Sequence, residues 1–167
     1  GKFDNPTADG LAVADITNNQ VYLYHNLPGS RSFVLNNTLY TGTGTRAVRF
    51  FDLDRDGHLD LIAGGTQQLR VFWGDGAGQF PQDTTMTTRG LVNAIDTGRV
   101  SFYNLRTIVF TESYVDYGWL SYLMNNNGRH LQYVTVTGPG GIDTIYQPLF
   151  DLAVGDLDGN ASHEVAA

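Results

Sequence analysis

The sequence predicts an all-β fold made of short antiparallel strands. Glycine accounts for 20 of the 167 residues and aromatic residues for 12 % of the chain, which is typical of closely turned β-structure. Val, Thr, Tyr and Phe recur in short runs bounded by turn residues, and no long amphipathic helix is visible. A hydrophobic content of 41 % is sufficient for a buried core.

An internal repeat of about 50 residues organises the chain. Its best copy, residues 48–80, holds an acidic loop between two apolar runs, then a third run and a glycine-rich turn. Residues 11–14 resemble residues 61–64 at a spacing of 50, and a second acidic loop begins at Asp156, 104 residues after Asp52. Acidic loops two periods apart indicate true repetition of a structural unit.

A unit of this length with three or four short strands has the size of one β-propeller blade. We expect one continuous region with approximate repeats at residues 1–45, 46–97, 98–149 and, in part, 150–167. This corresponds to about three blades of four-stranded antiparallel sheet. Propellers close with about four to eight blades, so we expect a piece of a larger propeller, or a subunit that self-associates to complete a ring.

The first acidic loop has the spacing of a metal site. Residues 52–60 place carboxylates at positions 1, 3, 5 and 9 and a glycine at position 6. Such carboxylates repel one another, and a divalent cation reverses the sign of that interaction. A flexible set of oxygen donors favours Ca²⁺ over Mg²⁺ or Zn²⁺. The predicted ligands are Asp52, Asp54, Asp56, Asp60 and the carbonyl oxygen of His58.

An EF-hand and a solvated acidic turn are the other interpretations of this loop. An EF-hand requires Glu at position 12, where this chain has Ala63, and flanking helices, whereas both flanks here are predicted to be strands. A solvated acidic turn without a metal remains the alternative for both loops. The second loop offers the side chains of Asp156, Asp158, Asn160 and Glu164, together with the carbonyl oxygen of Ser162.

The other two copies lack the acidic pattern. Copy one has Lys2, Asp4, Pro6 and Gly10 at the four ligand positions, and copy three has a shortened loop without an acid at residues 103–106. We therefore expect those two copies to be metal-free.

The spacing Asp52-x-Asp-x-Asp-Gly-x-x-Asp60 between β-runs, followed by residues 71–80, resembles the FG-GAP or VCBS repeat. This family occurs in the head of integrin α-subunits and in many secreted bacterial proteins. The resemblance implies a β-propeller with calcium held between the first two strands of a blade. The resemblance also implies an extracellular or cell-surface protein, because calcium-binding loops suit surroundings in which calcium is abundant.

Composition narrows the possible partners. The formal net charge is −7, so nucleic acid would be repelled. The absence of cysteine excludes thiolate metal sites and disulfides without fixing the compartment. The first residues show no apolar signal region, and no run approaches the roughly 20 apolar residues of a membrane span, so we expect a soluble mature chain.

No catalytic constellation is visible. The four histidines are scattered, and neither a phosphate-binding glycine loop nor a G-x-S-x-G motif occurs, so we predict a protein that is not an enzyme. Several aromatic residues at equivalent strand positions suit core packing, or sugar stacking as an alternative. They are Tyr22, Tyr24, Phe72, Trp73, Trp119 and Tyr122. Asn36-Asn37-Thr38 is a glycosylation sequon if the chain is secreted by a eukaryote.

The predicted function is a calcium-stabilised extracellular module that binds protein or glycan ligands without catalysis. One alternative is a structural subunit of an extracellular fibre or surface assembly. Another is an accessory part of a polysaccharide-degrading enzyme.

Overall fold

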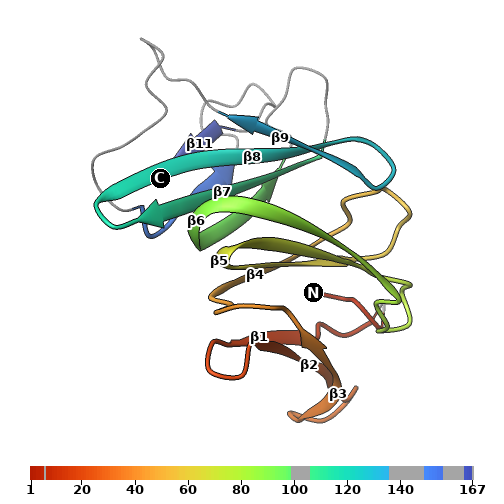
Figure 1. The fold of residues 1–167 in the computed structure, drawn as a ribbon. Coiled ribbons are helices and arrows are strands. Elements are labelled where there is room, and N and C mark those ends of the chain that lie inside the picture. Colours follow the sequence, from red (N-terminus) through yellow and green to blue (C-terminus); the bar gives the residue numbers. More distant parts are fainter. Residues whose placement is uncertain (6, 99–105, 136–148, 156–163, 167) are drawn as a thin grey trace.

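The computed structural model describes residues 1–5, 7–98, 106–135, 149–155 and 164–166. The described residues form eleven strands (Figure 1), and no helix capable of crossing a membrane occurs among them. The strands in chain order are β1 (Leu11–Asp15), β2 (Gln20–Asn26), β3 (Phe33–Tyr40), β4 (Ala47–Phe51), β5 (Asp60–Trp73), β6 (Gln82–Gly98), β7 (Thr107–Tyr114), β8 (Tyr117–Asn127), β9 (His130–Thr135), β10 (Ala153–Gly155) and β11 (Glu164–Ala166).

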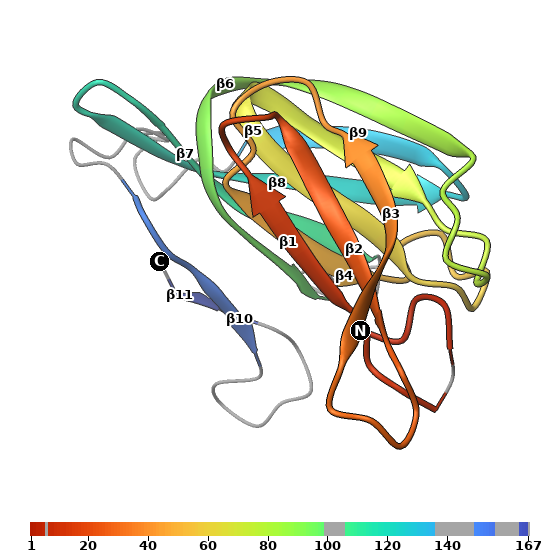
Figure 2. The ribbon, with the colours of Figure 1, turned by 90° about the horizontal axis from the view of Figure 1, so that it is seen from below.

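The strands form three antiparallel sheets. Strands β1, β2 and β3 make the first sheet, strands β4 to β9 make the second in sequence order, and β10 pairs with β11 in the third. The all-β fold with antiparallel blades is therefore confirmed. The described residues form no closed ring (Figure 2).

The second sheet contains two four-stranded blades. Strand β5 doubles back and supplies two strand segments to the first of these blades. Strand β6 supplies its first part to the same blade and its second part to the next. The backbone N–H of Gly74 donates to Asp60 at 3.0 Å, although Asp60 begins and Gly74 follows a strand that would be about 45 Å long if straight. Gln67 lies between the two arms of β5 with φ of +54°. The first part of β6 pairs with β5, and its second part pairs with β7. The four-stranded blade is thus visible twice.

Apolar side chains hold neighbouring sheets together. One core joins the first blade to the second and includes Phe3, Val21, Leu23, Leu61 and Phe72. Each of these residues is at most 4 % exposed. A second core joins the second blade to the third, and its members include Ile62, Leu69, Val71, Trp73, Ile108, Phe110 and Leu123. Opposite faces of β5 therefore supply two different interfaces, which is the stacking expected of propeller blades.

The first strands of successive blades lie side by side. Strand β4 lies next to the second part of β6, and β10 lies on that part of β6 too. Arg49 on β4 forms a 2.8 Å ion pair with Asp96 on β6, and the other oxygen of Asp96 accepts the N–H of Val154 at 2.9 Å. One carboxylate thus links strands β4, β6 and β10.

Candidate metal centre

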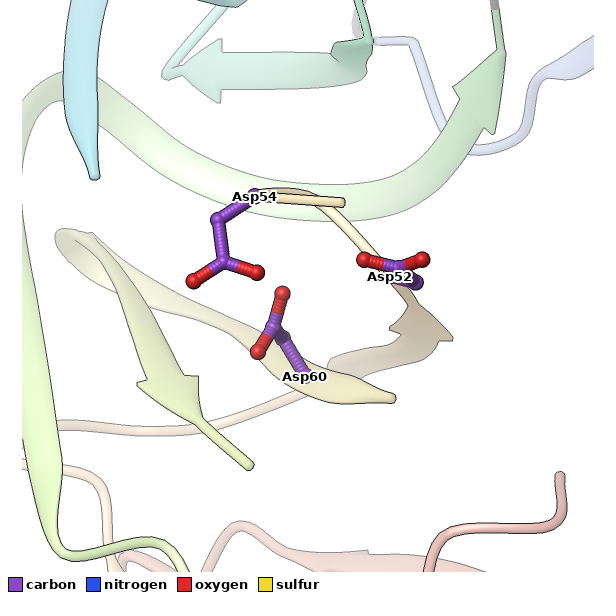
Figure 3. Close-up of side chains that lie close together, drawn as sticks. All are labelled: Asp52, Asp54 and Asp60. Atoms are coloured by element: carbon purple, nitrogen blue, oxygen red, sulfur yellow. The ribbon is translucent and has the colours of Figure 1, made fainter. Parts of the chain in front are cut away.

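The acidic loop connects β4 to β5 at one end of the second blade. Because Phe51 pairs with Asp60 in the antiparallel ladder, the two ends of the loop are held together. Figure 3 shows the side chains of Asp52, Asp54 and Asp60 directed toward one another. Each offers a carboxylate oxygen, and these oxygens lie within 4.8 Å of one another. Oxygen donors at such separations suit a cation of the size of Ca²⁺.

Hydrogen bonds between residues two positions apart shape the outer half of the loop. The carboxylate of Asp54 accepts the N–H of Asp56 at 3.2 Å, and the carboxylate of Asp56 accepts the N–H of His58 at 2.8 Å. The backbone turns at Arg55 and Gly57, whose φ angles are +67° and +90°. Glycine adopts the second of these conformations without steric cost, which agrees with a glycine at the sixth loop position.

Asp60 supports the loop from the protein interior. Its side chain is fully buried, and its two oxygens accept the N–H of Leu53 at 2.8 Å and the N–H of Gly74 at 3.0 Å. Burial raises the pKa of Asp60 to about 6 from an ordinary 3.8, and the charges of Asp54 and Asp56 act in the same direction. The two backbone hydrogen bonds act against this shift. A bound cation would favour the ionised carboxylate.

Asp52 provides the observation that best fits a metal. Its Oδ1 atom is buried and finds no hydrogen-bond partner among the described residues. A buried carboxylate oxygen without a donor is unfavourable, because it has lost water and gained nothing in return. A cation bound to Asp52 through Oδ1 would satisfy this atom. The residues present therefore fit a divalent ion with oxygen ligands.

The remaining predicted ligands of the first loop, Asp56 and the carbonyl oxygen of His58, are not members of this group of three carboxylates. Asp56 lies in the outer turn with 35 % of its side chain exposed, and it is not one of the three converging carboxylates. His58 is exposed, and its ring lies against the turn at Gly76. The ligand roles of Asp56 and of the His58 carbonyl oxygen stay predictions.

The second predicted loop lies mostly outside the described residues, which exclude Asp156, Asp158, Asn160 and Ser162. Its two flanking strands are described, and Gly155 pairs with Glu164. This pair stands 104 residues after the pair of Phe51 and Asp60. The strand pairing that frames the first loop is thus repeated two periods later.

Three residues of the third blade contact the acidic loop, and sequence reasoning did not find them. Arg106 forms an ion pair with Asp52 at 3.5 Å, and Arg129 donates to Asp54 at 2.9 Å. The side chain of Asn125 donates to the carbonyl oxygen of Leu53 at 2.8 Å. These contacts span more than 50 residues of sequence and arise only from the stacking of two blades.

The structure also shows the surroundings of two predicted aromatic residues, of the sequon and of the loop in copy one. Phe72 and Trp73 are at most 4 % exposed, so these two aromatic residues belong to the core. The amide nitrogen of Asn36, in the sequon, donates to the carbonyl oxygen of Gly78 at 3.3 Å. In copy one, Asp4 lies 3.4 Å from His25, and no third metal-binding side chain of the described residues joins this pair.

Comparison with known protein families gives one match. The family described as FG-GAP-like repeat matches residues 8–63 and again residues 52–102, which together cover more than half of the chain. Searches of curated proteins and of solved structures gave no match.

Proposed function

The chain belongs to the FG-GAP-like repeat family, and on this premise we propose that it is a calcium-stabilised binding module that works outside the cytoplasm. The observation that carries the proposal is the convergence of Asp52, Asp54 and Asp60, together with the unpartnered Oδ1 atom of Asp52. FG-GAP repeats are typical of extracellular proteins and often bind calcium, which supports both the ion and the location.

In this proposal the three carboxylates hold the ion between the first two strands of the second blade. Calcium supplies positive charge to a group of acids that otherwise repel one another. Asp60 ties the ion to the interior, because its oxygens already fix the backbone of Leu53 and Gly74. The loop stiffens as a result, and stiff loops at one rim of a blade array suit the recognition of a protein or glycan ligand.

A second role, self-association into an extended or closed assembly, is favoured by one specific observation. The first sheet exposes large apolar side chains, and Leu11, Val13, Phe33 and Leu35 are each at least 40 % exposed. Exposed apolar patches of this kind commonly mark protein interaction sites. We propose that self-association is compatible with ligand binding, since the calcium loops of an assembled propeller would still be exposed to a ligand.

Calcium titration of chelator-treated protein tests the proposal. We expect saturable binding by calorimetry and a higher melting temperature in calcium, because a ligand of the folded state stabilises it by about 2.7 kcal/mol at 100 times its Kd. Asp52→Asn should weaken binding at least tenfold, since it removes a ligand charge at the unpartnered oxygen. Asp9→Asn is the matched control, because it removes an acid that is 74 % exposed and distant in sequence from the loop.

The contrary outcome is clear. Equal melting temperatures in saturating calcium and in chelator, with no heat of binding, would remove calcium from the proposed function. Loss of binding in both Asp52→Asn and Asp9→Asn would show that general acidity, rather than the loop, attracts the ion.

A further inference from the structure

Arg129 of the third blade forms ion pairs with the acidic loop of the second blade. It lies in the turn between β8 and β9, and its Nε donates to Asp54 Oδ2 at 2.9 Å. Its Nη2 lies 3.8 Å from Asp56 Oδ2. The guanidinium also contacts the side-chain oxygen of Gln82 and lies 5.1 Å from the centre of the Trp73 ring. One cationic side chain therefore holds two of the four loop acids.

Both oxygens of Asp54 already accept a hydrogen bond in this arrangement. Oδ2 accepts from Arg129, and Oδ1 accepts the backbone N–H of Asp56. The Asp54 side chain is only 7 % exposed, so water screens its ion pair poorly. A cation that uses Asp54 must either share a carboxylate with a guanidinium or displace it.

Arg106 strengthens the same pattern. Its Nη2 lies 3.5 Å from Asp52 Oδ2, and its Nη1 donates to the backbone carbonyl of Asp52. Its guanidinium also lies 5.0 Å from the centre of the Phe51 ring. Asp52 and Asp54, two of the three converging carboxylates, are thus both paired with arginines supplied by the following repeat.

We propose that Arg129 competes with calcium for the acidic loop. Calcium binding then weakens the contact of Arg129 with the loop, and this contact lowers the affinity of the loop for calcium. The inference rests on the proposed calcium site. Without calcium, Arg129 neutralises Asp54 and Asp56 and fastens the third blade to the second. With calcium, the ion neutralises the same acids, and the arginine contact weakens. Opposition of this kind is reciprocal, because two ligands that bind one site exclusively must each lower the affinity of the other.

Replacement of Arg129 tests this competition. Arg129→Gln should bind calcium about tenfold more tightly than the wild type, because the competing charge is gone. The metal-free melting temperature of this variant should fall, and its calcium-saturated melting temperature should fall much less. A purely structural role for Arg129 would lower both temperatures alike and leave the calcium affinity unchanged.

Two further variants sharpen the experiment. Arg129→Lys keeps the charge but loses the forked geometry of the guanidinium, so its affinity should lie between those of the wild type and Arg129→Gln. This variant also serves if Arg129→Gln does not fold. Arg70→Gln is the matched control, because Arg70 also pairs with an aspartate, Asp83 at 2.8 Å, and lies over a ring, Phe72 at 4.9 Å. It should leave calcium affinity unchanged.

The outcomes separate the inference from the function on which it rests. Tighter binding by Arg129→Gln than by the wild type supports both. Binding by the wild type with equal or weaker binding by Arg129→Gln overturns the competition and keeps the calcium site. Binding by Arg129→Gln alone supports the competition but removes calcium from the wild-type function. Absence of binding in both proteins overturns the two together.

Discussion

At the scale of single residues, Asp60 links the acidic loop to the protein interior. Its burial and the neighbouring acids raise its pKa to about 6. A raised carboxyl pKa means that the folded state holds the proton more tightly than the unfolded chain does. In the metal-free protein, the contribution of Asp60 to stability therefore declines as the pH rises from about 4 to about 6. In the proposed site, calcium would bind the ionised form of Asp60, so its contribution to stability would increase as the pH rises.

We predict from this residue that calcium affinity depends on pH. Below about pH 6, calcium must displace a proton from Asp60, so affinity should fall up to tenfold for each further pH unit. Carbon-detected NMR of the Asp60 carboxyl should show a midpoint near 6 without calcium and a clearly lower midpoint with calcium. A metal-free midpoint near the ordinary 3.8 would contradict the prediction.

At the scale of strands, Glu112 on β7 ties the third blade together. The side chain is fully buried, and Oε1 accepts from Ser121 on β8 and Tyr133 on β9, each at 2.6 Å. Its Oε2 accepts the backbone N–H groups of Arg89 at 2.5 Å and Gly90 at 3.2 Å on β6. Burial and the bond to Glu112 raise the pKa of Tyr133 to about 12. One carboxylate therefore connects four strands.

We predict that Glu112→Ala lowers the free energy of unfolding by about 3–5 kcal/mol, because it leaves several buried donors unpaired. Glu112→Gln keeps one acceptor oxygen and should cost roughly half as much. Denaturant unfolding measures both variants against Asp116→Ala, which removes an exposed acid from the turn between β7 and β8. A loss below about 1 kcal/mol for Glu112→Ala would show that water replaces the missing partner.

The strands also show which features the sequence could predict. The pairing of β4 with β5 and the convergence of Asp52, Asp54 and Asp60 follow from local spacing, since a loop between antiparallel strands must close on itself. Arg129 could not be predicted, because it lies 75 residues after Asp54 and no local pattern marks it. The sequence did not predict that β6 is shared by two blades either, because this depends on its pairing with two different neighbours, β5 and β7.

At the scale of the molecule, the first blade exposes a face whose equivalent in the second blade is buried. Leu11 pairs with Tyr24, and Tyr24 pairs with Leu35, so these three side chains share one face of the sheet. Leu11 and Leu35 are 44 % and 51 % exposed. Leu61, one repeat after Leu11, is fully buried in the core that joins the first blade to the second. The exposed face therefore has the chemistry of a blade interface.

We predict that this face drives self-association of the 167-residue chain. In a solution of the purified chain, a blade that covers this face has to come from a second copy. The apparent mass in light scattering should rise with protein concentration, and the double variant Leu11→Lys with Leu35→Lys should remain at the mass of one chain. Val115→Lys is the control, since Val115 is 72 % exposed in the turn between β7 and β8 and lies off this face. If the wild type stays monomeric at every concentration, the face does not bind a second copy, and self-association would be removed as a role of this chain.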